Sequence, residues 1–306
     1  MKLLLLGANG QVGWELQRSL APLGELIVCD RHSADLTQLS PLSALIETQQ
    51  PDVIVNAAAY TAVDQAEQDV DNAFLINAEA VGLLACKAAQ LGSYLVHYST
   101  DYVFDGTKSG AYQESDAVNP QSVYGKSKLK GEQLIAASGC NHLIFRTSWV
   151  FARRGQNFAK TMLKLAAEKD SLQVVADQYG APTSAEMIAD ITALCLYKAT
   201  QLSKESMLPD KFLENLSGIY HLAAAGETNW HGYAQYLIEK ASSLGFATRV
   251  SVEDIQAVST ENFPRPAPRP ANSVMNTSKL SSTFDITLPD WRCYVDRLLD
   301  ELFPGY

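Results

Sequence analysis

The sequence lacks several features that would place it in a specialised class of protein. Its five cysteines are scattered and form no C-x-x-C pair, which argues against a disulfide framework and against a zinc site. Its formal net charge is −10, so it has no excess of basic residues with which to bind nucleic acid or an acidic membrane. No fixed-period repeat or low-complexity tract interrupts it. We therefore expect a globular protein whose cysteines fill apolar space in a reducing, cytoplasmic compartment.

Long hydrophobic runs are also missing. The N-terminal run, residues 2–6, stops at Gly7 without a cleavage-site pattern, so it reads neither as a signal peptide nor as a membrane span. A short, continuous apolar run is typical of a strand covered on both faces of a parallel sheet. We therefore expect a buried first strand and no membrane partner.

What is present is the composition of a globular α/β protein. The 306 residues are 47% hydrophobic and 19% charged, enough to bury a sizeable core. Strand-like runs, the fifth of them over residues 142–151, alternate with helical patterns, which favours a Rossmann-type, doubly wound parallel sheet. Residues 201–216 are polar and are expected to be irregular. We predict a dinucleotide-binding domain over residues 1–150, with returning segments near 170–200 and 217–225. Residues 226–306, with about 151–169, would form a smaller, mostly C-terminal substrate-binding lobe.

A glycine-rich turn directly follows the first predicted strand. Residues 7–13 read G-A-N-G-Q-V-G, and a helical pattern begins after them. Glycines at this point permit a tight turn and close approach of the backbone to a pyrophosphate, while the helix N-terminus favours the anion. Such glycines also mark purely structural turns. Their place between an N-terminal strand and a helix favours a dinucleotide site.

The second predicted strand ends in Asp30 and Arg31, about 20 residues past the glycines. An acidic residue there can accept hydrogen bonds from the adenosine ribose of NAD, whereas an arginine can meet the 2′-phosphate of NADP. The alternative is a turn with solvated charges. Because both residues occur in succession, NADH and NADPH both stay open.

Two hydroxyls and a carboxylate end the fourth predicted strand, which covers residues 94–101. In an open parallel sheet this end faces the same crevice as the glycine turn, so Thr100 is a candidate donor to a substrate oxygen. His97 lies within the strand, and we expect it to be a core histidine. Asn77 lies on the buried stripe of a helix predicted over 64–91. It is either a satisfied core asparagine or a support for the neighbouring loop.

Tyr124 and Lys128 are four residues apart in a predicted helix, so their side chains share one face. An unperturbed tyrosine has a pKa of about 10, and a nearby ammonium would lower it toward the range useful for proton transfer. The spacing by itself is also that of an ordinary solvated helix face. The rest of the sequence gives the pair its interpretation as a catalytic one.

A proline-rich segment, residues 263–270, cannot be helix interior because its prolines lack backbone donors and fix φ. It carries Arg265 and Arg269, which on a stiffened loop could clamp a phosphate. A simple proline-rich crossing over the surface is the alternative.

Taken in order, the glycine turn, the hydroxyl after the fourth strand and the Tyr-x-x-x-Lys pair resemble the extended short-chain dehydrogenase/reductase superfamily. Within it, four stretches look like the dTDP-4-dehydrorhamnose reductase family: S-T-D-Y-V-F-D-G (99–106), R-T-S-W-V-F (146–151), D-Q-Y-G-A-P-T (177–183) and R-P-A-N-S (269–273). The resemblance runs from residue 2 to about 303. It implies that NADPH or NADH reduces the C4 ketone of dTDP-4-dehydro-β-L-rhamnose, the last step of dTDP-rhamnose biosynthesis.

The resemblance also implies roles for individual residues. Tyr124 would be the general acid, Lys128 its electrostatic partner and a ribose ligand, and Thr100 the hydroxyl that positions the substrate oxygen. The cofactor would be held by Gly7, Asn9, Gly10, Gln11, Val12, Gly13, Asp30, Arg31, Ala59, Tyr60, Thr61, Tyr124 and Lys128. The dTDP-sugar would meet Thr100, Asp101, Val103, Phe104, Trp149 and Arg269.

Assembly and metal binding follow from the same resemblance. Some members of the family form dimers held through Mg²⁺ and glutamates, and Glu15, Glu186 and Glu301 occupy matching positions here. Carboxylates suit magnesium, which prefers hard oxygen ligands. We therefore expect a homodimer and consider a magnesium site, with solvated helix charges as the alternative.

Two other functions stay open. A nucleotide-sugar epimerase or dehydratase of the same superfamily would need acid/base residues next to the carbonyl, and no glutamate pair follows Thr100. A non-catalytic regulatory subunit, like the family's relatives associated with methionine adenosyltransferase, would not need Tyr124 and Lys128.

Overall fold

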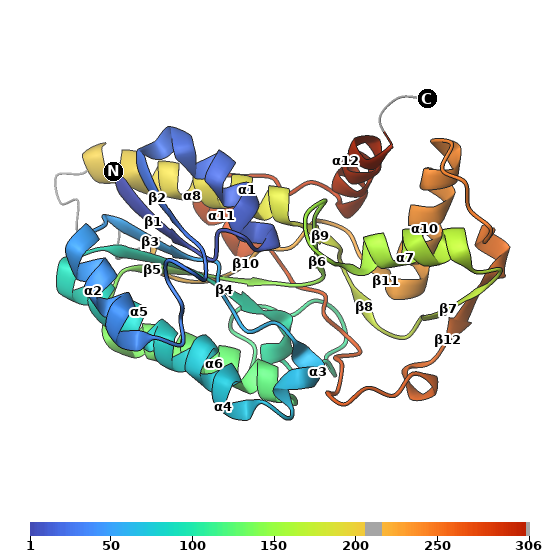
Figure 1. The fold of residues 1–306 in the computed structure, drawn as a ribbon, viewed down its shortest axis with the longest axis horizontal. Coiled ribbons are helices and arrows are strands. Elements are labelled where there is room, and N and C mark those ends of the chain that lie inside the picture. Colours follow the sequence, from blue (N-terminus) through green and yellow to red (C-terminus); the bar gives the residue numbers. More distant parts are fainter. Residues whose placement is uncertain (206–215, 304–306) are drawn as a thin grey trace.

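The computed structural model describes residues 1–205 and 216–303 of the chain. Its centre is a six-stranded sheet in the spatial order β10-β5-β4-β3-β1-β2, and every neighbouring pair is parallel (Figure 1). The strands are β1 (Lys2–Leu6), β2 (Glu25–Cys29), β3 (Val53–Asn56), β4 (Tyr94–Thr100), β5 (His142–Thr147) and β10 (Gly218–His221). The predicted α/β class and the parallel sheet are confirmed.

Both faces of the sheet are buried because successive side chains of a strand point to opposite sides. In β1, Leu3 and Leu5 pack into one hydrophobic cluster, and Leu4 and Leu6 pack into another on the opposite face. All four side chains are fully buried. The continuous apolar run at the N-terminus is therefore required by the double-sided burial of the strand.

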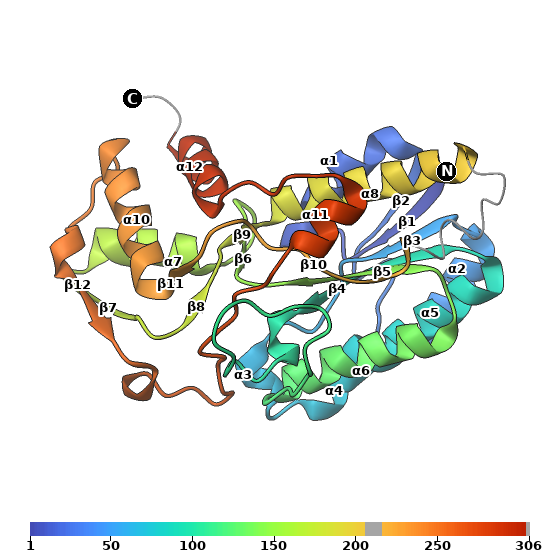
Figure 2. The same cartoon turned by 180° about the vertical axis from the view of Figure 1, so that it is seen from behind.

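Helices cover the two faces as separate layers (Figures 1 and 2). One layer contains α1 (Gln11–Leu20), α8 (Ala185–Glu205) and α11 (Ser278–Phe284), and the other contains α2 (Leu39–Gln49), α5 (Ala80–Leu91) and α6 (Val123–Ser138). A three-residue 3₁₀ turn, η1 (Ala21–Leu23), joins α1 to β2. Both layers place helix N-termini at the carboxyl end of the sheet.

The order of the strands fixes where a ligand can bind. The chain runs from β1 outward to β2 and then returns to the other side of β1 to form β3. Such a reversal is a topological switch point, and ligands of open α/β sheets bind in the crevice outside the carboxyl ends of the strands there.

The helix predicted over 64–91 is broken into four pieces. They are α3 (Val63–Ala66), α4 (Val70–Phe74), a π-helical turn η2 (Leu75–Glu79) and α5. Residues Val70–Leu91 have the length and hydropathy of a membrane span. Their apolar side chains, Val81 and Leu84 among them, instead pack against the central sheet, as in the core helix of a globular fold.

A smaller part extends from the carboxyl end of the sheet (Figure 1). It contains two helices, α7 (Phe158–Glu168) and α10 (Trp230–Ser243). It also contains three two-stranded sheets, in which β6 (Val150–Phe151) pairs with β9 (Thr183–Ser184), β8 (Tyr179–Gly180) pairs with β11 (Thr228–Asn229), and β7 (Leu172–Val175) pairs with β12 (Ile255–Val258). The remaining short elements are η4 (Val252–Asp254), η5 (Thr260–Asn262) and α12 (Trp291–Leu302).

Two segments lie elsewhere than the sequence predicted. Residues 172–175, grouped with the dinucleotide-binding part, pair with β12 in the smaller part because the hydrogen-bonding partner lies some 80 residues downstream. Helix α11, grouped with the smaller lobe, packs on β10 of the central sheet through Leu280 and Phe284. Residues 201–205, expected to be irregular, continue α8, and 206–215 lie outside the described residues.

Candidate active site

The carboxyl ends of β1, β3, β4 and β5 border one cavity of about 740 Å³. Of the predicted site residues, those that line it are Gly7, Asn9, Gly10, Gln11, Val12, Arg31, Ala59, Thr61, Thr100, Asp101, Tyr124, Lys128 and Trp149. Gly13, Asp30, Tyr60, Val103, Phe104 and Arg269 are described by the structure but are not part of this lining. One cavity thus brings together the predicted cofactor residues and the predicted catalytic residues.

The glycine turn has the geometry that its sequence predicts. Gly7 has φ +81°, a left-handed conformation that side chains rarely adopt, and Gly10 N donates to Gly7 O at 3.0 Å. A Cβ atom at Gly13 would lie 2.1 Å from Gly7 O, so only glycine lets α1 approach the turn so closely. Gln11 and Val12 begin α1, and the free backbone N–H groups of its first turn give this wall of the cavity a partial positive charge.

The side chain of Asp30 is held by hydrogen bonds, whereas that of Arg31 is largely exposed. The Asp30 carboxylate accepts hydrogen bonds from Ser33 N, His32 N and Asn9 Nδ2, and these bonds, led by those from Ser33, lower its pKa. The Arg31 side chain is 80% exposed, and its Nε lies 3.5 Å from Asp35 Oδ2. Arg31 lines the cavity, whereas Asp30 orders the turn beside it.

Asn77 supports the loop that follows β3. Its Oδ1 accepts from Tyr60 N at 2.9 Å, and its Nδ2 donates to Tyr60 O and to Ser127 Oγ, both at 3.0 Å. Asn77 is therefore both a buried asparagine whose side chain is fully hydrogen-bonded and a support for the loop after β3. The π-helical turn that carries Asn77 points its side chain at the loop, and π-turns are frequent at functional sites.

Tyr124 and Lys128 are placed by the first two turns of α6. Ser122 Oγ caps the helix by accepting from Gly125 N at 3.1 Å. A Cβ at position 125 would lie 2.2 Å from Tyr102 O, so Gly125 allows the helix to pack against the segment after β4. The Tyr124 ring meets the edge of the Tyr102 ring with centroids 5.5 Å apart.

The expected effect of Lys128 on Tyr124 is not seen in the free protein. Lys128 Nζ donates to Tyr98 O at 2.6 Å and lies 3.2 Å from His97 Nε2. Burial raises the pKa of Tyr124 to about 12, and burial lowers the pKa of Lys128 to about 8. The free protein does not show the lowered tyrosine pKa that the sequence predicted, because burial disfavours the charged form of each side chain.

Thr100 is held by its neighbours at the end of β4. Its Oγ1 donates to Asp101 Oδ1 at 2.9 Å and accepts from Tyr102 N at 3.2 Å. The other carboxylate oxygen of Asp101 accepts from Ser273 Oγ. Burial raises the pKa of Asp101 to about 6. In this state the hydroxyl hydrogen of Thr100 is directed at Asp101, and its oxygen is available as an acceptor.

Trp149 forms a wall of the cavity in an unusual backbone conformation. Its φ is +51°, which breaks the predicted strand 142–151 into β5 and β6. The turn lays its ring on that of Trp230 from α10, with centroids 3.6 Å apart and planes at 15°. Trp230 Nε1 donates to Gln178 Oε1 at 3.1 Å, which fixes the stack.

Three predicted substrate residues lie beside the cavity. Val103, the last residue of the 3₁₀ turn η3 (Asp101–Val103), and Phe104, which follows it, are buried with Tyr112 in a separate hydrophobic cluster. Their contact with the sugar nucleotide stays a prediction. Arg269 Nη2 lies 2.8 Å from Asp64 Oδ2. Arg265 lies over the Phe263 ring, 5.1 Å from its centroid.

The three glutamates predicted to bind magnesium share a small pocket, but with three arginines, Arg18, Arg153 and Arg297. Glu186 Oε2 accepts from Arg297 Nε at 2.7 Å, Glu301 lies 3.4 Å from Arg297, and Glu15 lies 3.8 Å from Arg18. Among residues 1–205 and 216–303, no group of three acidic, histidine or cysteine side chains is arranged to hold a metal ion. The magnesium site is therefore not supported, since guanidinium groups already neutralise its carboxylates.

Several cavity residues were missed from the sequence. Asp35 and Leu36 follow β2, Ser148 follows β5, and Gly155 and Gln156 come from the loop before α7. The two segments 34–36 and 155–156 reach the cavity only through loop conformations that carry no periodic pattern. Ser148 lies inside the strand predicted over residues 142–151, so its place after the end of β5 could not be read from the sequence.

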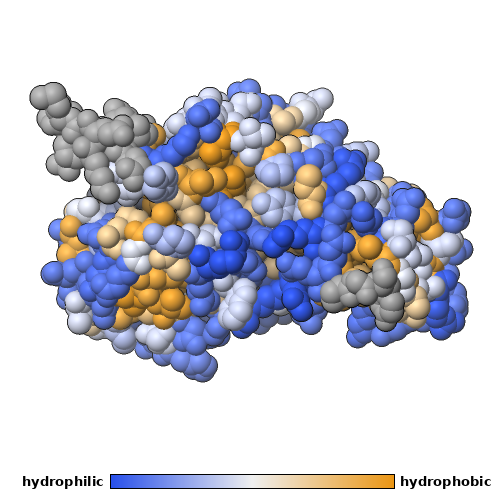
Figure 3. All heavy atoms as spheres, turned by 90° about the horizontal axis from the view of Figure 1, so that it is seen from above, coloured by the Kyte–Doolittle hydropathy of each residue, from blue (hydrophilic) through white to orange (hydrophobic). Residues whose placement is uncertain are grey.

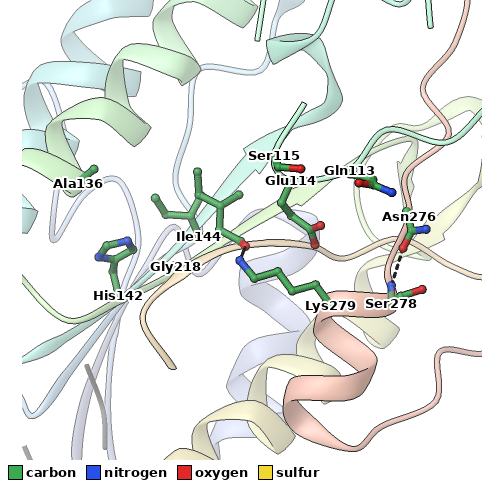
Figure 4. Close-up of a pocket in the computed structure, with 11 residues that line it drawn as sticks. Gln113, Glu114, Ser115, Ala136, His142, Ile144, Gly218, Asn276, Ser278 and Lys279 are labelled. Atoms are coloured by element: carbon green, nitrogen blue, oxygen red, sulfur yellow. Dashed lines mark hydrogen bonds between the residues drawn. The ribbon is translucent and has the colours of Figure 1, made fainter. Parts of the chain in front are cut away.

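A second cavity of about 710 Å³ lies between β10 and the segments 113–115 and 276–279 (Figure 4). Lys279 Nζ donates to Ile219 O at 2.8 Å. Figure 4 also shows the hydrogen bond from Ser278 N to Asn276 Oδ1. The described residues around it include none of the predicted site residues. The chemistry therefore belongs to the first cavity.

A glycine turn at the switch point, a cavity at the carboxyl end of the sheet and a Tyr-x-x-x-Lys pair facing that cavity define an oxidoreductase of the Rossmann type. The family model "RmlD substrate binding domain" matches residues 1–303. A dTDP-4-dehydrorhamnose reductase of Burkholderia thailandensis is 48% identical over 302 residues, 99% of this chain and 99% of that protein. The chain belongs to the dTDP-4-dehydrorhamnose reductase family, and the predicted family is confirmed.

Solved structures support the same assignment. The dTDP-4-dehydrorhamnose reductase of Clostridium acetobutylicum superposes with a TM-score of 0.86 at 36% identity, covering 99% of each chain. That of Bacillus anthracis, solved in complex with NADP, superposes with a TM-score of 0.84 at 32% identity, covering 98% of this chain and 100% of that one.

Proposed function

We propose that the protein is an NAD(P)H-dependent dTDP-4-dehydrorhamnose reductase, which reduces the C4 ketone of dTDP-4-dehydro-β-L-rhamnose to give dTDP-L-rhamnose. The observation that carries the proposal is that Tyr124, Lys128 and Thr100 line the same cavity as the glycine turn. A hydride donor bound along the turn would therefore meet a proton donor at one site. The relatives at 48% and 36% identity carry the same activity in their names.

The residues of the cavity fit a nicotinamide dinucleotide. Gly7 and Gly10 leave the backbone open to a pyrophosphate, and the N-terminus of α1 faces the same space. Asp30, Arg31 and Asp35 lie where the adenosine ribose would bind, and Ala59 and Thr61 line the slot toward Tyr124. When bound, the reduced nicotinamide supplies the hydride. The exposed guanidinium of Arg31 supports NADPH, while the carboxylates of Asp30 and Asp35 support NADH.

Tyr124 is the proton donor in this proposal. A phenol whose pKa is about 12 is fully protonated near pH 7, so it reaches the ketone with its proton in place. The developing alkoxide at C4 takes that proton, which neutralises its charge as it forms. Lys128 then faces a tyrosinate, and its ammonium form stabilises that charge.

Thr100 orients the reacting oxygens. Its hydroxyl hydrogen is directed at Asp101 while that carboxylate is ionised. Protonation of Asp101 would release the hydrogen, and Thr100 could then donate to the substrate oxygen. Asp101 and Trp149 would form the wall against which the sugar nucleotide lies.

We assign the smaller part, with Trp149 and Trp230 stacked at its edge, to the dTDP-sugar, and the central sheet to the cofactor. We also propose a homodimer in the cytoplasm. The face that contains α1 and α8 is mostly hydrophilic, with smaller hydrophobic areas (Figure 3), and its exposed side chains include Trp14, Leu194 and Tyr197. Light scattering on the purified protein tests this assembly, and a monomer mass would contradict it.

The function is tested with purified protein, dTDP-4-dehydrorhamnose and each reduced nicotinamide. We expect the reduced-nicotinamide absorbance to fall in proportion to the dTDP-L-rhamnose formed. Isomerised ketone without consumption of nicotinamide would instead identify an epimerase. No turnover of any keto sugar, with tight binding of another protein, would identify a regulatory subunit.

A further inference from the structure

His97 is a buried ionisable residue that the proposed reaction does not use. It lies in β4 with 1% of its surface exposed. Its Nδ1 is 3.2 Å from Asn56 Nδ2 on β3, and its Nε2 is 3.2 Å from Lys128 Nζ on α6. The three side chains form a continuous chain of polar contacts from the sheet to the helix that carries Tyr124.

The orientation of the Asn56 carboxamide is set by the backbone. Its Oδ1 accepts a hydrogen bond from Ala58 N at 3.1 Å, and a backbone N–H can only donate. The amide nitrogen of Asn56 therefore faces His97. Because an amide NH₂ group also can only donate, His97 Nδ1 must be the acceptor.

This contact decides which ring nitrogen of His97 carries the proton. Burial, followed by the charge of Lys128, holds the pKa of His97 well below its usual range, so the ring is neutral and carries one proton. With Nδ1 accepting, that proton is on Nε2 and points at Lys128 Nζ. An ammonium group has no lone pair, so two donors would face each other. An amine would accept the Nε2–H and still donate to Tyr98 O at 2.6 Å.

We propose that His97 is a positioning residue that presents an Nε2–H donor to the Lys128 nitrogen and thereby favours the amine form of Lys128 in the free enzyme. Lys128 then takes up a proton from solvent when a negative charge forms beside it on Tyr124, and its ammonium form stabilises that charge. Only the expected effect on kcat/KM rests on the proposed function. The contact geometry itself concerns the free protein.

The other ionisable groups around Lys128 are accounted for. Glu132, one turn along α6, raises the pKa of Lys128, but its carboxylate is bound by Arg146 of β5, through Nε at 2.9 Å and Nη2 at 2.6 Å. Asp101, Tyr98, Tyr102 and Tyr124 are further ionisable residues that line the same cavity. Burial lowers the pKa of Lys128 to about 8, which brings the amine form closer to neutral pH.

The tautomer is measured directly by long-range ¹H–¹⁵N correlation spectra of ¹⁵N-histidine-labelled protein without cofactor. The chain has five histidines, and the His97→Gln variant assigns the signals of His97. We expect the Nε2–H tautomer from pH 6 to pH 8. The Nδ1–H tautomer, or an imidazolium ring in this range, would overturn the proposal. Because no turnover is involved, the result is independent of whether the protein reduces the keto sugar.

An Asn56→Asp variant should reverse the tautomer of His97. One carboxylate oxygen can still accept from Ala58 N, and the other can accept from His97 Nδ1, so the proton moves to Nδ1 and Nε2 becomes an acceptor for the Lys128 ammonium. We expect the Nδ1–H tautomer and a shift of the alkaline limb of kcat/KM upward by about one pH unit. Asn77→Asp is the matched control, since it adds the same charge beside α6 at a residue that contacts Ser127, and it should leave the proton on Nε2. An unchanged tautomer in Asn56→Asp would contradict the proposal.

Discussion

The buried ion pair between Glu132 and Arg146 joins α6 to β5 directly below Lys128. Both side chains are 3% exposed, and two parallel hydrogen bonds connect them. Arg146 Nη1 has no hydrogen-bond partner among the described residues, so the guanidinium depends on this one carboxylate. Replacing Glu132 with Met would leave a buried charge with several unpaired donors.

We expect Glu132→Met to lower the free energy of unfolding by about 3–5 kcal/mol, the usual cost of removing one partner of a buried pair. The double variant Glu132→Met/Arg146→Met should recover most of this loss, because two apolar side chains of similar length need no partners. Denaturant unfolding of the wild type, both single variants and the double variant measures the coupling. The exposed pair Arg249–Asp170 is the control, and Asp170→Ala should cost less than about 1 kcal/mol.

A Glu132→Met variant as stable as Asp170→Ala would refute this reasoning, and so would a double variant whose loss equals the sum of the two single losses. Activity offers a second readout. Because Glu132 raises the pKa of Lys128, its removal should lower the alkaline limit of turnover even where the protein remains folded.

Two further predictions concern the cavity. Arg31→Ala should raise the KM for NADPH about tenfold while changing that for NADH little, because only NADPH offers a phosphate to the guanidinium; equal effects on both cofactors, measured by steady-state kinetics, would remove Arg31 from the cofactor site. Burial raises the pKa of Asp101 in the folded protein to about 6, compared with an ordinary value of 3.8. Between pH 3.8 and pH 6 the folded state therefore binds more protons than the unfolded state, and the stability of the protein falls as the pH rises through this range. Asp101→Asn should therefore gain stability relative to the wild type between pH 4.5 and pH 7, by up to about 3 kcal/mol in chemical denaturation; a difference that does not vary with pH would contradict the assignment.

The sequence predicted the parts of the molecule that depend on local patterns. The apolar runs of β1, β3 and β4 form the buried strands of the sheet, and the glycines at 7–13 form a turn at its switch point. The spacing of Tyr124 and Lys128 places both at the cavity. Each of these features follows from neighbours in the chain, so a single sequence suffices to find it.

Features that depend on distant partners could not be predicted. The left-handed backbone at Trp149 is held by stacking on Trp230, some 80 residues away, and this turned a predicted strand into two. Phe104 stacks on Tyr112, with ring centroids 4.2 Å apart. His97 was expected to be a plain core histidine, and only the structure shows that its two nitrogens meet Asn56 and Lys128.

The central claim is that Tyr124 delivers the proton to the C4 oxygen while the cofactor supplies hydride. A single-turnover experiment with preformed enzyme–NADPH complex, dTDP-4-dehydrorhamnose and the Tyr124→Phe variant tests it most directly. We predict that hydride transfer slows by a factor of about 10²–10⁴ while NADPH affinity, measured by fluorescence titration, stays within twofold of the wild type. An unchanged rate of hydride transfer in Tyr124→Phe would show that the proton comes from another group and would contradict the account.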